Sequence, residues 1–326
     1  MAERVDLMAE PDRNLALELV RATEAAAIRA VPFIGKGDKL AADGAAVDAM
    51  RAFLATVHFD GVVVIGEGEK DKAPMLFNGE HVGNGDGPPA DIAVDPIDGT
   101  TMTAQGRQNA LSMIAVSDRH TMLDASTVFY MEKLVTDHHG IGVCSLDQSI
   151  GDNIRELAKA KRKNVGEMVI AVLDRPRHQE LIEEIRATGA GTRLLLDGDV
   201  AGGINAARYE TRIDMCVGTG GSPEGVVTAC AIKALGGFIQ GRLAPKDDAE
   251  RARGEAAGLD LDRIYDADGL VSGNNTMFVA TGVTDGGLVE GVRRKGPIIR
   301  TESIVLRSRS GTLRRIISDH VAERWL

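Results

Sequence analysis

The sequence is poor in aromatic residues and carries no excess of positive charge. Phe, Trp and Tyr make up 3% of its 326 residues, and the formal net charge is −10 at pH 7. Proteins that bind nucleic acid stack bases on aromatic rings and neutralise phosphates with clustered Lys and Arg. Both deficits predict that neither nucleic acid nor an anionic membrane is a main partner. An anionic small substrate stays compatible with this charge if a bound metal or a few local cations meet it.

Cysteine and long apolar runs are scarce as well. The three cysteines, Cys144, Cys216 and Cys230, lie far apart and form no CxxC pattern, which predicts free buried thiols in a reducing compartment. No apolar run reaches the roughly 18–20 residues of a membrane span, and the charged first residues contain no apolar signal segment. These absences predict a soluble, cytoplasmic protein.

The residues that are abundant predict a large aliphatic core with many tight turns. Hydrophobic residues make up 44% of the chain, and 38 residues are glycine. Helical patterns occupy 14–29 and 45–57, a charged stretch at 245–258 predicts a solvated helix, and buried strands are expected at 62–65, 92–94 and 111–116.

Strand, loop and helix then alternate through residues 168–237, which favours parallel α/β layering there. We therefore predict the α/β class, with an α+β front half. The expected division is a metal-binding half at 1–165 and a half with substrate-binding loops at 166–326, tightly packed as one unit.

Acidic residues gather where two predicted strands end. Glu67 follows the run 62–65, and Asp95 follows 92–94 in the segment DIAVDPIDGTTM. If these strands are neighbours, both carboxylates lie at one sheet edge, and a turn at Pro96 brings Asp98 beside them. Crowded carboxylates repel unless a cation lies between them, and an all-oxygen ligand set suits Mg²⁺ or Mn²⁺. The sequence therefore predicts a divalent metal site.

Gly99 and Thr100 continue this segment, and two interpretations of the threonine are open. Thr100 could be a simple N-cap of the following helix. Beside a metal site, its hydroxyl could instead position a water molecule. The N–H groups that open the helix could face an anion.

Three other motifs fit less well. GEGEKD lacks the third glycine of GxGxxG, because Asp71 stands in its place, and GTGGSPEG lacks the GK[ST] of a P-loop. DPIDGT has one residue more than the DxDGT signature of phosphatases with a nucleophilic aspartate.

Cationic and glycine-rich loops follow later strands. Arg175 and Arg177 flank a proline, and the arginine fork suits phosphate, although an exposed loop is the alternative. In GTGGSPEG the glycines precede a helix start, so Glu224 could complement the helix dipole or close a metal site. The DGD segment at 197–199 could bind hydroxyls or phosphate, or form a turn. His178 is expected to cap a helix or lie on the surface.

Six segments follow one another along the chain: VVVIGEGEKDKAPML, DIAVDPIDGTTMTA, FYMEKL, DRPRH, DGDVAGGI and GTGGSPEGVV. Together and in this order they closely resemble class II fructose-1,6-bisphosphatases, within the lithium-sensitive, metal-dependent sugar and inositol phosphatases. The resemblance runs from about residue 11 to residue 316. KGDKLAADGAA, YMEKL and SPEG narrow it to class II.

The resemblance implies a layered αβαβα sandwich of the sugar phosphatase and inositol monophosphatase type, and a homo-oligomer, tetramer or dimer. It implies that Thr100 orients the attacking water, that Asp71 or a neighbouring acid is its base, and that Lys39 takes part in catalysis. The implied metal ligands are Asp43, Glu67, Asp95, Asp98 and Glu224. The implied substrate-binding residues are Asp98, Gly99, Thr100, Tyr130, Arg175, Pro176, Arg177, Asp197, Gly198, Asp199 and Gly221. Some members have Glu at the place of Asp98 and Lys at that of Arg175.

The expected activity is hydrolysis of fructose 1,6-bisphosphate to fructose 6-phosphate and phosphate, a step of gluconeogenesis, with Mg²⁺ or Mn²⁺. Related alternatives are sedoheptulose 1,7-bisphosphate, alone or as a second substrate, and inositol monophosphates. A non-catalytic sugar-phosphate sensor is the alternative from another functional class.

Overall fold

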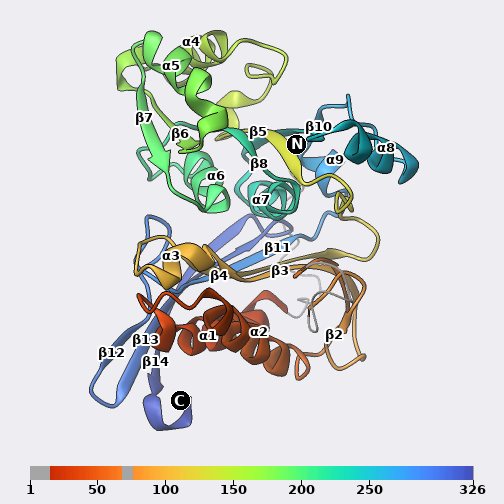
Figure 1. The fold of residues 1–326 in the computed structure, drawn as a ribbon, viewed down its shortest axis with the longest axis vertical. Coiled ribbons are helices and arrows are strands. Elements are labelled where there is room, and N and C mark those ends of the chain that lie inside the picture. Colours follow the sequence, from red (N-terminus) through yellow and green to blue (C-terminus); the bar gives the residue numbers. More distant parts are fainter. Residues whose placement is uncertain (1–14, 68–75, 326) are drawn as a thin grey trace. The chain divides into compact units, whose positions relative to one another are not determined.

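The computed structural model describes residues 15–67 and 76–325, which fall into two compact units (Figure 1). The first unit takes the residues up to 120 together with those from 274 onward, and the second takes 121–273. This division differs from the predicted boundary at residue 165. The last strands of the chain return to pair with strands of the first unit, and local sequence patterns do not encode such distant pairing.

An eight-stranded mixed sheet forms the first unit, in the order β12-β13-β11-β4-β3-β1-β2, with β14 paired to β13. β1 and β3 are parallel, whereas β4 is antiparallel to both β3 and β11. The strands are β1 (Asp60–Ile65), β2 (His81–Val82), β3 (Pro89–Asp98), β4 (Leu111–Asp118), β11 (Met277–Gly282), β12 (Arg293–Lys295), β13 (Ile298–Arg307) and β14 (Thr312–Val321).

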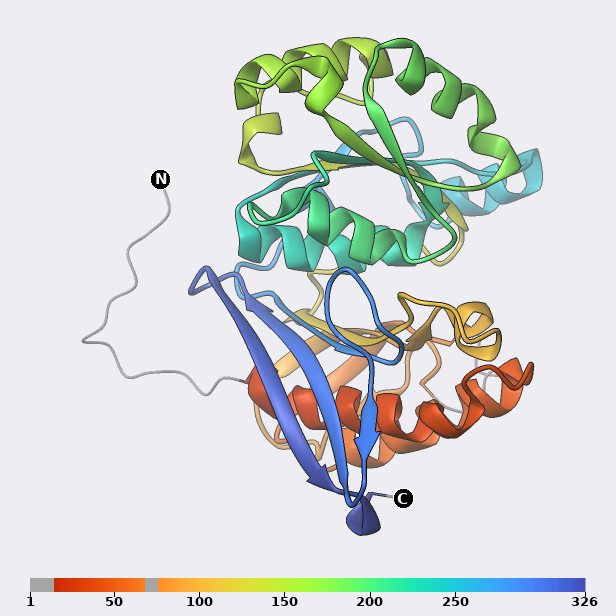
Figure 2. The ribbon, with the colours of Figure 1, turned by 90° about the vertical axis from the view of Figure 1, so that its left-hand side faces the viewer.

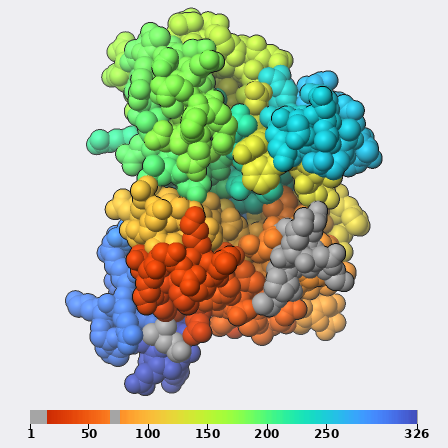
Figure 3. All heavy atoms as spheres, viewed as in Figure 1, coloured from red at the N-terminus to blue at the C-terminus, as the bar shows by residue number. Residues whose placement is uncertain are grey.

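Two long helices cover one face of this sheet, α1 (Leu15–Ala30) and α2 (Lys39–Leu54) (Figure 1; their outer surface is red in Figure 3). Leu19 of α1 and Met50 of α2 belong to one buried cluster with Ile92, Ile114 and Val279 of the sheet. α2 begins earlier than predicted because the Asp38 side chain accepts a 2.9 Å hydrogen bond from the Ala41 N–H and caps the helix. A 3₁₀ turn, η1 (Val31–Phe33), precedes this cap, and the short α3 (Thr100–Ala104) follows β3.

The second unit is a six-stranded sheet between helices, in the order β10-β9-β5-β8-β6-β7. β6 is parallel to β7 and β8, which confirms the expected parallel layering, whereas β5 runs antiparallel to β8 and β9. The strands are β5 (Tyr130–Thr136), β6 (Val169–Leu173), β7 (Gly191–Leu195), β8 (Met215–Gly221), β9 (Phe238–Leu243) and β10 (Tyr265–Asp266).

Helices lie on both faces of this sheet (Figures 1 and 2). α4 (Ile150–Lys161) and α5 (Gln179–Ala187) pack on one face through Ile154 and Ile182, which share a core with Ile170. α6 (Asp199–Ala207) and α7 (Ser222–Leu235) lie on the other face. The predicted solvated helix is α8 (Asp248–Ala256), which is mostly exposed (blue in Figure 3), and α9 (Ala267–Leu270) follows it. The 3₁₀ turns are η2 (His138–Gly140), η3 (Val165–Glu167), η4 (Pro176–His178) and, in the first unit, η5 (Ala322–Arg324).

The α/β class and the alternation of helix and sheet layers are thereby confirmed. A helix layer on a sheet in the first unit, and a sheet between two helix layers in the second, supply the layers expected of an αβαβα sandwich. Among residues 15–67 and 76–325, no helix combines the length and apolar character that a membrane span needs.

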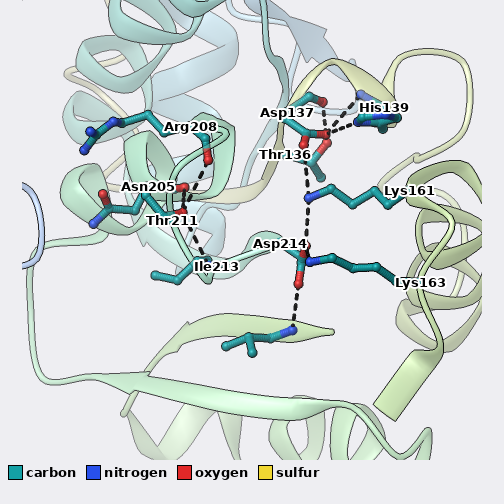
Figure 4. A network of polar contacts seen from close by, with 11 residues as sticks. Thr136, Asp137, His139, Lys161, Lys163, Asn205, Arg208, Thr211, Ile213 and Asp214 are labelled. Atoms are coloured by element: carbon teal, nitrogen blue, oxygen red, sulfur yellow. Dashed lines mark hydrogen bonds and ion pairs between the residues drawn. The ribbon is translucent and has the colours of Figure 1, made fainter. Parts of the chain in front are cut away.

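A buried aspartate fixes one end of the second sheet (Figure 4). Asp214 accepts hydrogen bonds from Nζ of Lys161 at 2.8 Å and of Lys163 at 2.7 Å, and from the Val169 N–H at 3.1 Å. Burial by itself raises the pKa of Asp214, but these bonds outweigh it and the pKa lies below its ordinary value. Lys161 also pairs with Asp137 at 3.0 Å. The network joins the end of α4 to the start of β6 and to the residue before β8.

Candidate active site

Two acids of the first unit, Glu67 and Asp95, lie near the carboxyl ends of β1 and β3, which are parallel neighbours in the sheet. Ile65 of β1 pairs with Ala93 of β3, and Glu67 and Asp95 each follow their member of that pair by two residues. The condition set by the sequence, that the two strands lie side by side, is therefore met. Carboxyl ends of parallel strands are where such sheets place functional groups.

β3 does not end at residue 94 as predicted but continues to Asp98. Asp95 pairs with Met113 and Asp98 with Leu111, so three steps along β3 match two along β4. The expected turn at Pro96 is thus a β-bulge inside the strand, where a residue without an N–H is tolerated. The bulge carries Asp98 to the end of the strand, where it is 7% exposed.

Asp43 of α2 lies close enough to Glu67 to alter its ionisation. Burial, and to a smaller extent the charge of Asp43, together raise the pKa of Glu67 to about 7. Burial also raises the pKa of Asp43. Two partly desolvated carboxylates that repel each other form a place where a cation would be stabilised.

α3 begins directly after these acids. Gly99 is its N-cap residue, with φ of +91°, a conformation that suits glycine, and Thr100 is the first helical residue. The structure therefore does not support Thr100 as the N-cap, and the interpretation of its hydroxyl as positioning a water molecule stays a prediction. The Gly35 and Gly37 N–H groups donate to the Thr103 and Ala104 carbonyls at 2.9 and 2.8 Å.

These two bonds tie the loop before α2 to α3. Lys39, the exposed first residue of α2, lies one helical turn before Asp43 and therefore on the same helix face. Asp71 falls outside the described residues.

In the second unit, the residues singled out by sequence follow three parallel strands. Arg175 follows β6, Asp197 follows β7 and Glu224 follows β8, so all three lie beyond the carboxyl ends of these parallel strands. Tyr130 starts the antiparallel β5 and pairs with Gly221 at the end of β8, which places Tyr130 at the same end of the sheet.

The two arginines are held in different ways. Nε and Nη2 of Arg177 donate to the Thr219 carbonyl at 3.0 and 2.8 Å, and its guanidinium lies 4.9 Å from the centre of the Tyr130 ring. Nη2 of Arg175 is 3.5 Å from the Asp197 carboxylate. Pro176 between them opens the turn η4.

His178 is the N-cap residue of α5, one of the two positions expected from the sequence, but its side chain makes no capping hydrogen bond and is buried rather than on the surface. Its Nδ1 lies 2.8 Å from the Leu173 carbonyl, and its Nε2 accepts the Thr219 N–H at 2.8 Å. Burial lowers its pKa, so the ring serves as a neutral link between β6 and β8.

Lys133 of β5 is a residue that sequence reasoning missed. Its side chain is 8% exposed, forms an ion pair with Asp199 and donates to the Gly221 carbonyl at 2.9 Å. The motif YMEKL contains it, but nothing in the local pattern marks a lysine on a central strand as buried. Asp199 itself follows Gly198, which caps α6 with φ of +76°.

Glu224, on the first turn of α7, carries a buried Oε2 that has no hydrogen-bond partner among the described residues. Burial raises its pKa; the charge of Lys133 opposes this shift and that of Asp199 adds to it. A Cβ at Gly221 would overlap the Glu224 carboxylate, so glycine there lets this carboxylate keep its present position. A buried carboxylate oxygen without a donor is a ligand atom suited to a cation.

A second group of residues of metal-ligand types, Asp137, His138 and His139, has ligand atoms within 4.8 Å of one another. Figure 4 shows Asp137 and His139 of this group. Asp137 accepts from the His139 backbone N–H at 3.1 Å and pairs with Lys161, so its oxygens already have partners. The group follows the end of β5, whereas Tyr130 starts that strand. It is therefore distinct from the residues around Glu224.

Comparison with known proteins agrees with the motifs. The family model of bacterial, glpX-encoded fructose-1,6-bisphosphatase matches residues 13–320. Class 2 fructose-1,6-bisphosphatases of Escherichia coli strain K12, E. coli O6:H1 and Shigella flexneri are each 43% identical over 325 residues, covering 96% of this chain and 96% of theirs.

Proposed function

The chain belongs to the bacterial, glpX-encoded class II fructose-1,6-bisphosphatases, and from this we propose that it hydrolyses D-fructose 1,6-bisphosphate to fructose 6-phosphate and phosphate. The reaction removes the 1-phosphate and is a step of gluconeogenesis. The observation that carries the proposal is the 43% identity over 96% of both chains. The region matched by the family model, residues 13–320, spans every motif described above.

We propose that Asp43, Glu67, Asp95, Asp98 and Glu224 hold Mg²⁺ or Mn²⁺. The donor set consists only of oxygens, which hard divalent cations prefer. The charge of Asp43, which contributes to the raised pKa of Glu67, and the unpartnered oxygen of Glu224 support the fit. When bound, such an ion neutralises phosphate charge and lowers the pKa of a water molecule.

The chain's own groups then aim the attack. Thr100 is proposed to orient the attacking water through its hydroxyl, with Asp71 or a neighbouring acid as the base. Backbone N–H groups after Gly99 are proposed to donate to the equatorial phosphate oxygens, and Lys39 to meet phosphate charge.

Specificity for a bisphosphate is proposed to come from the second unit. Arg175, Pro176 and Arg177 form the loop for the distal 6-phosphate, because the guanidinium fork matches phosphate oxygens. Tyr130 supports this loop from below the Arg177 guanidinium. The segment 197–199 and Gly221 are proposed to contact the sugar.

Phosphate release from a panel of substrates tests this proposal. Fructose 1,6-bisphosphate, sedoheptulose 1,7-bisphosphate and inositol 1-phosphate should be assayed with Mg²⁺, with Mn²⁺ and with a chelator. The expected result is metal-dependent release from fructose 1,6-bisphosphate that the chelator abolishes. Preferred release from inositol phosphate would contradict the role given to the arginine loop.

Thr100→Ala separates an enzyme from a sugar-phosphate sensor. An enzyme loses most of its turnover in this variant while substrate affinity changes little, because the hydroxyl contributes to the attack. A sensor would show no turnover in either form, with equal ligand affinity. Binding by calorimetry and phosphate release should be measured on the same preparations.

We further propose that the protein is a cytoplasmic homo-oligomer, a dimer or tetramer. Cys144, Cys216 and Cys230 are free and buried, which suits a reducing compartment. Sedimentation of the purified protein tests the oligomeric state.

A further inference from the structure

β14 forms an edge of the sheet in the first unit (Figure 2). It pairs with β13 along all ten residues in an unbroken antiparallel register, so β11 and β12 must share the other side of β13. No strand among the described residues pairs with the outer side of β14. This side presents backbone N–H and C=O groups to a further strand.

The edge lacks several of the usual protections against pairing. Natural proteins blunt exposed edges with proline, bulges, short strands or charged residues, lysine above all. β14 is ten residues long, contains no proline or lysine and has a continuous register, and its charged residues are Arg314, Arg315 and Asp319. One face carries Leu313, Arg315, Ile317, Asp319 and Val321 in alternation. Ile317 is 64% exposed and Val321 is 45% exposed, both unusually open for aliphatic residues of a strand.

We propose that a second copy of this chain pairs with β14 in antiparallel orientation, with a two-fold axis at Ile317. In this register Arg315 faces the partner's Asp319, Leu313 faces the partner's Val321, and the two copies of Ile317 face each other. A C2 interface requires such self-complementarity, in which one surface meets its own copy. The pattern of β14 satisfies it on both sides of the axis.

Neighbouring registers do not match. An axis at residue 316 places Arg315 opposite Ile317 and Leu313 opposite Asp319. An axis at residue 318 places Ile317 opposite Asp319 and Arg315 opposite Val321. Axes at 315 and 319 bring like charges together, which destabilises a strand pair.

Charges on β13 extend the match. Asp319 accepts from Nε and Nη2 of Arg300 at 2.7 and 2.8 Å, and Nη1 of Arg315 lies 3.0 Å from Glu302. Pairing across the axis would therefore complete a row of four charges of alternating sign, Arg300 and Asp319 of one copy with Arg315 and Glu302 of the other. Arg315 also donates to the Leu288 carbonyl, which orders its side chain over β13.

Charge variants test the interface by sedimentation velocity. Arg315→Asp places two like-charged pairs across the axis, as does Asp319→Arg, so each variant alone should show half the particle mass of the wild type. An equimolar mixture of the two variants restores opposite charges at both contacts and should regain the wild-type mass. Intrachain effects are identical before and after mixing, so recovery reports on the contact between copies.

A cysteine at the axis provides a second test. Paired residues in antiparallel strands have Cα atoms about 4.5–5.5 Å apart, within the range of a disulfide. Ile317→Cys should therefore form disulfide-linked dimers under mild oxidation. Val321→Cys is the matched control, because it faces residue 313 and not itself.

The two tests have defined outcomes. A wild-type particle with the mass of one chain overturns the proposal, as does an unchanged mass in both charge variants. Equal cross-linking at 317 and 321 contradicts the register. Circular dichroism confirms that the variants fold, and none of the changed residues belongs to the proposed catalytic or substrate-binding set, so loss of the interface is distinguishable from failure of the proposed function.

Discussion

Replacing Lys133 by methionine should destabilise the second unit markedly. Methionine keeps an unbranched apolar stem as far as the ε position but removes the ammonium group, and with it the charge that pairs with Asp199 and the hydrogen bond to the Gly221 carbonyl. The side chains of Lys133 and Asp199 are 8% and 14% exposed, so the remaining carboxylate would be left largely desolvated. Removing one partner of a buried pair costs about 3–5 kcal/mol, and the residual exposure of Asp199 places the expected loss near about 3 kcal/mol.

Thermal unfolding in chelator measures this loss without stabilisation by bound metal. For a unit of the size of residues 121–273, each kcal/mol corresponds to roughly 2–4 °C, so Lys133→Met should lower Tm by about 6–12 °C. Adding Asp199→Asn should recover much of it, because the unpaired charge is then removed.

Lys159→Met is the control for this prediction. Lys159 also pairs with an acid, Glu156, but both side chains are exposed (71% and 49%), and its loss should change stability by less than about 0.5 kcal/mol. If Lys133→Met unfolded at the same temperature as Lys159→Met, the structural role given to the buried pair would be refuted.

Three further substitutions test other parts of the structure. Folding raises the pKa of Glu67 from its ordinary value of 4.5 to about 7, so ionisation of this carboxyl destabilises the fold as pH rises through that range. In chelator, Glu67→Gln should therefore be more stable than the wild type by up to about 3 kcal/mol at about pH 8 and equally stable below about pH 4. Thermal melts at both pH values would show this. The pKa of Asp214 is lowered by folding, so its ionised carboxylate stabilises the fold at pH values above its ordinary pKa of 3.8. Asp214→Asn should lower the free energy of unfolding in denaturant by about 3 kcal/mol at neutral pH, and this loss should shrink as pH falls through the folded pKa. A loss that stays constant with pH would contradict the charge-based account. Arg177→Ala should raise KM for fructose 1,6-bisphosphate on the order of 10–100-fold. Arg175→Ala should raise it less, because Asp197 already offsets part of the Arg175 charge. Equal increases in KM in steady-state kinetics would contradict this distinction.

Much of the candidate site could be predicted because its residues follow strands. The β-branched run before Glu67 and the apolar run before Asp95 mark two buried strands, and parallel pairing then brings the acids together. What local patterns could not reveal is the register. The bulge that extends β3 to Asp98 depends on the pairing with β4, and burial of His178 and Lys133 depends on strands far away in sequence. The boundary between the two units differs from the predicted one for the same reason, since β11 pairs with β4 over a separation of more than 150 residues.

The distribution of charge in the second unit explains why Glu224 keeps an unpartnered oxygen although cations are close. Lys133 is committed to Asp199 and the Gly221 carbonyl, and Arg175 lies beside Asp197. Arg177 is held by the Thr219 carbonyl and the Tyr130 ring, neither of which carries a full negative charge. Of these three cations, Arg177 is the one whose contacts offset its charge least, while Glu224 keeps the unpartnered carboxylate oxygen. We therefore propose that a ligand bringing both a phosphate and a metal ion satisfies these two side chains together.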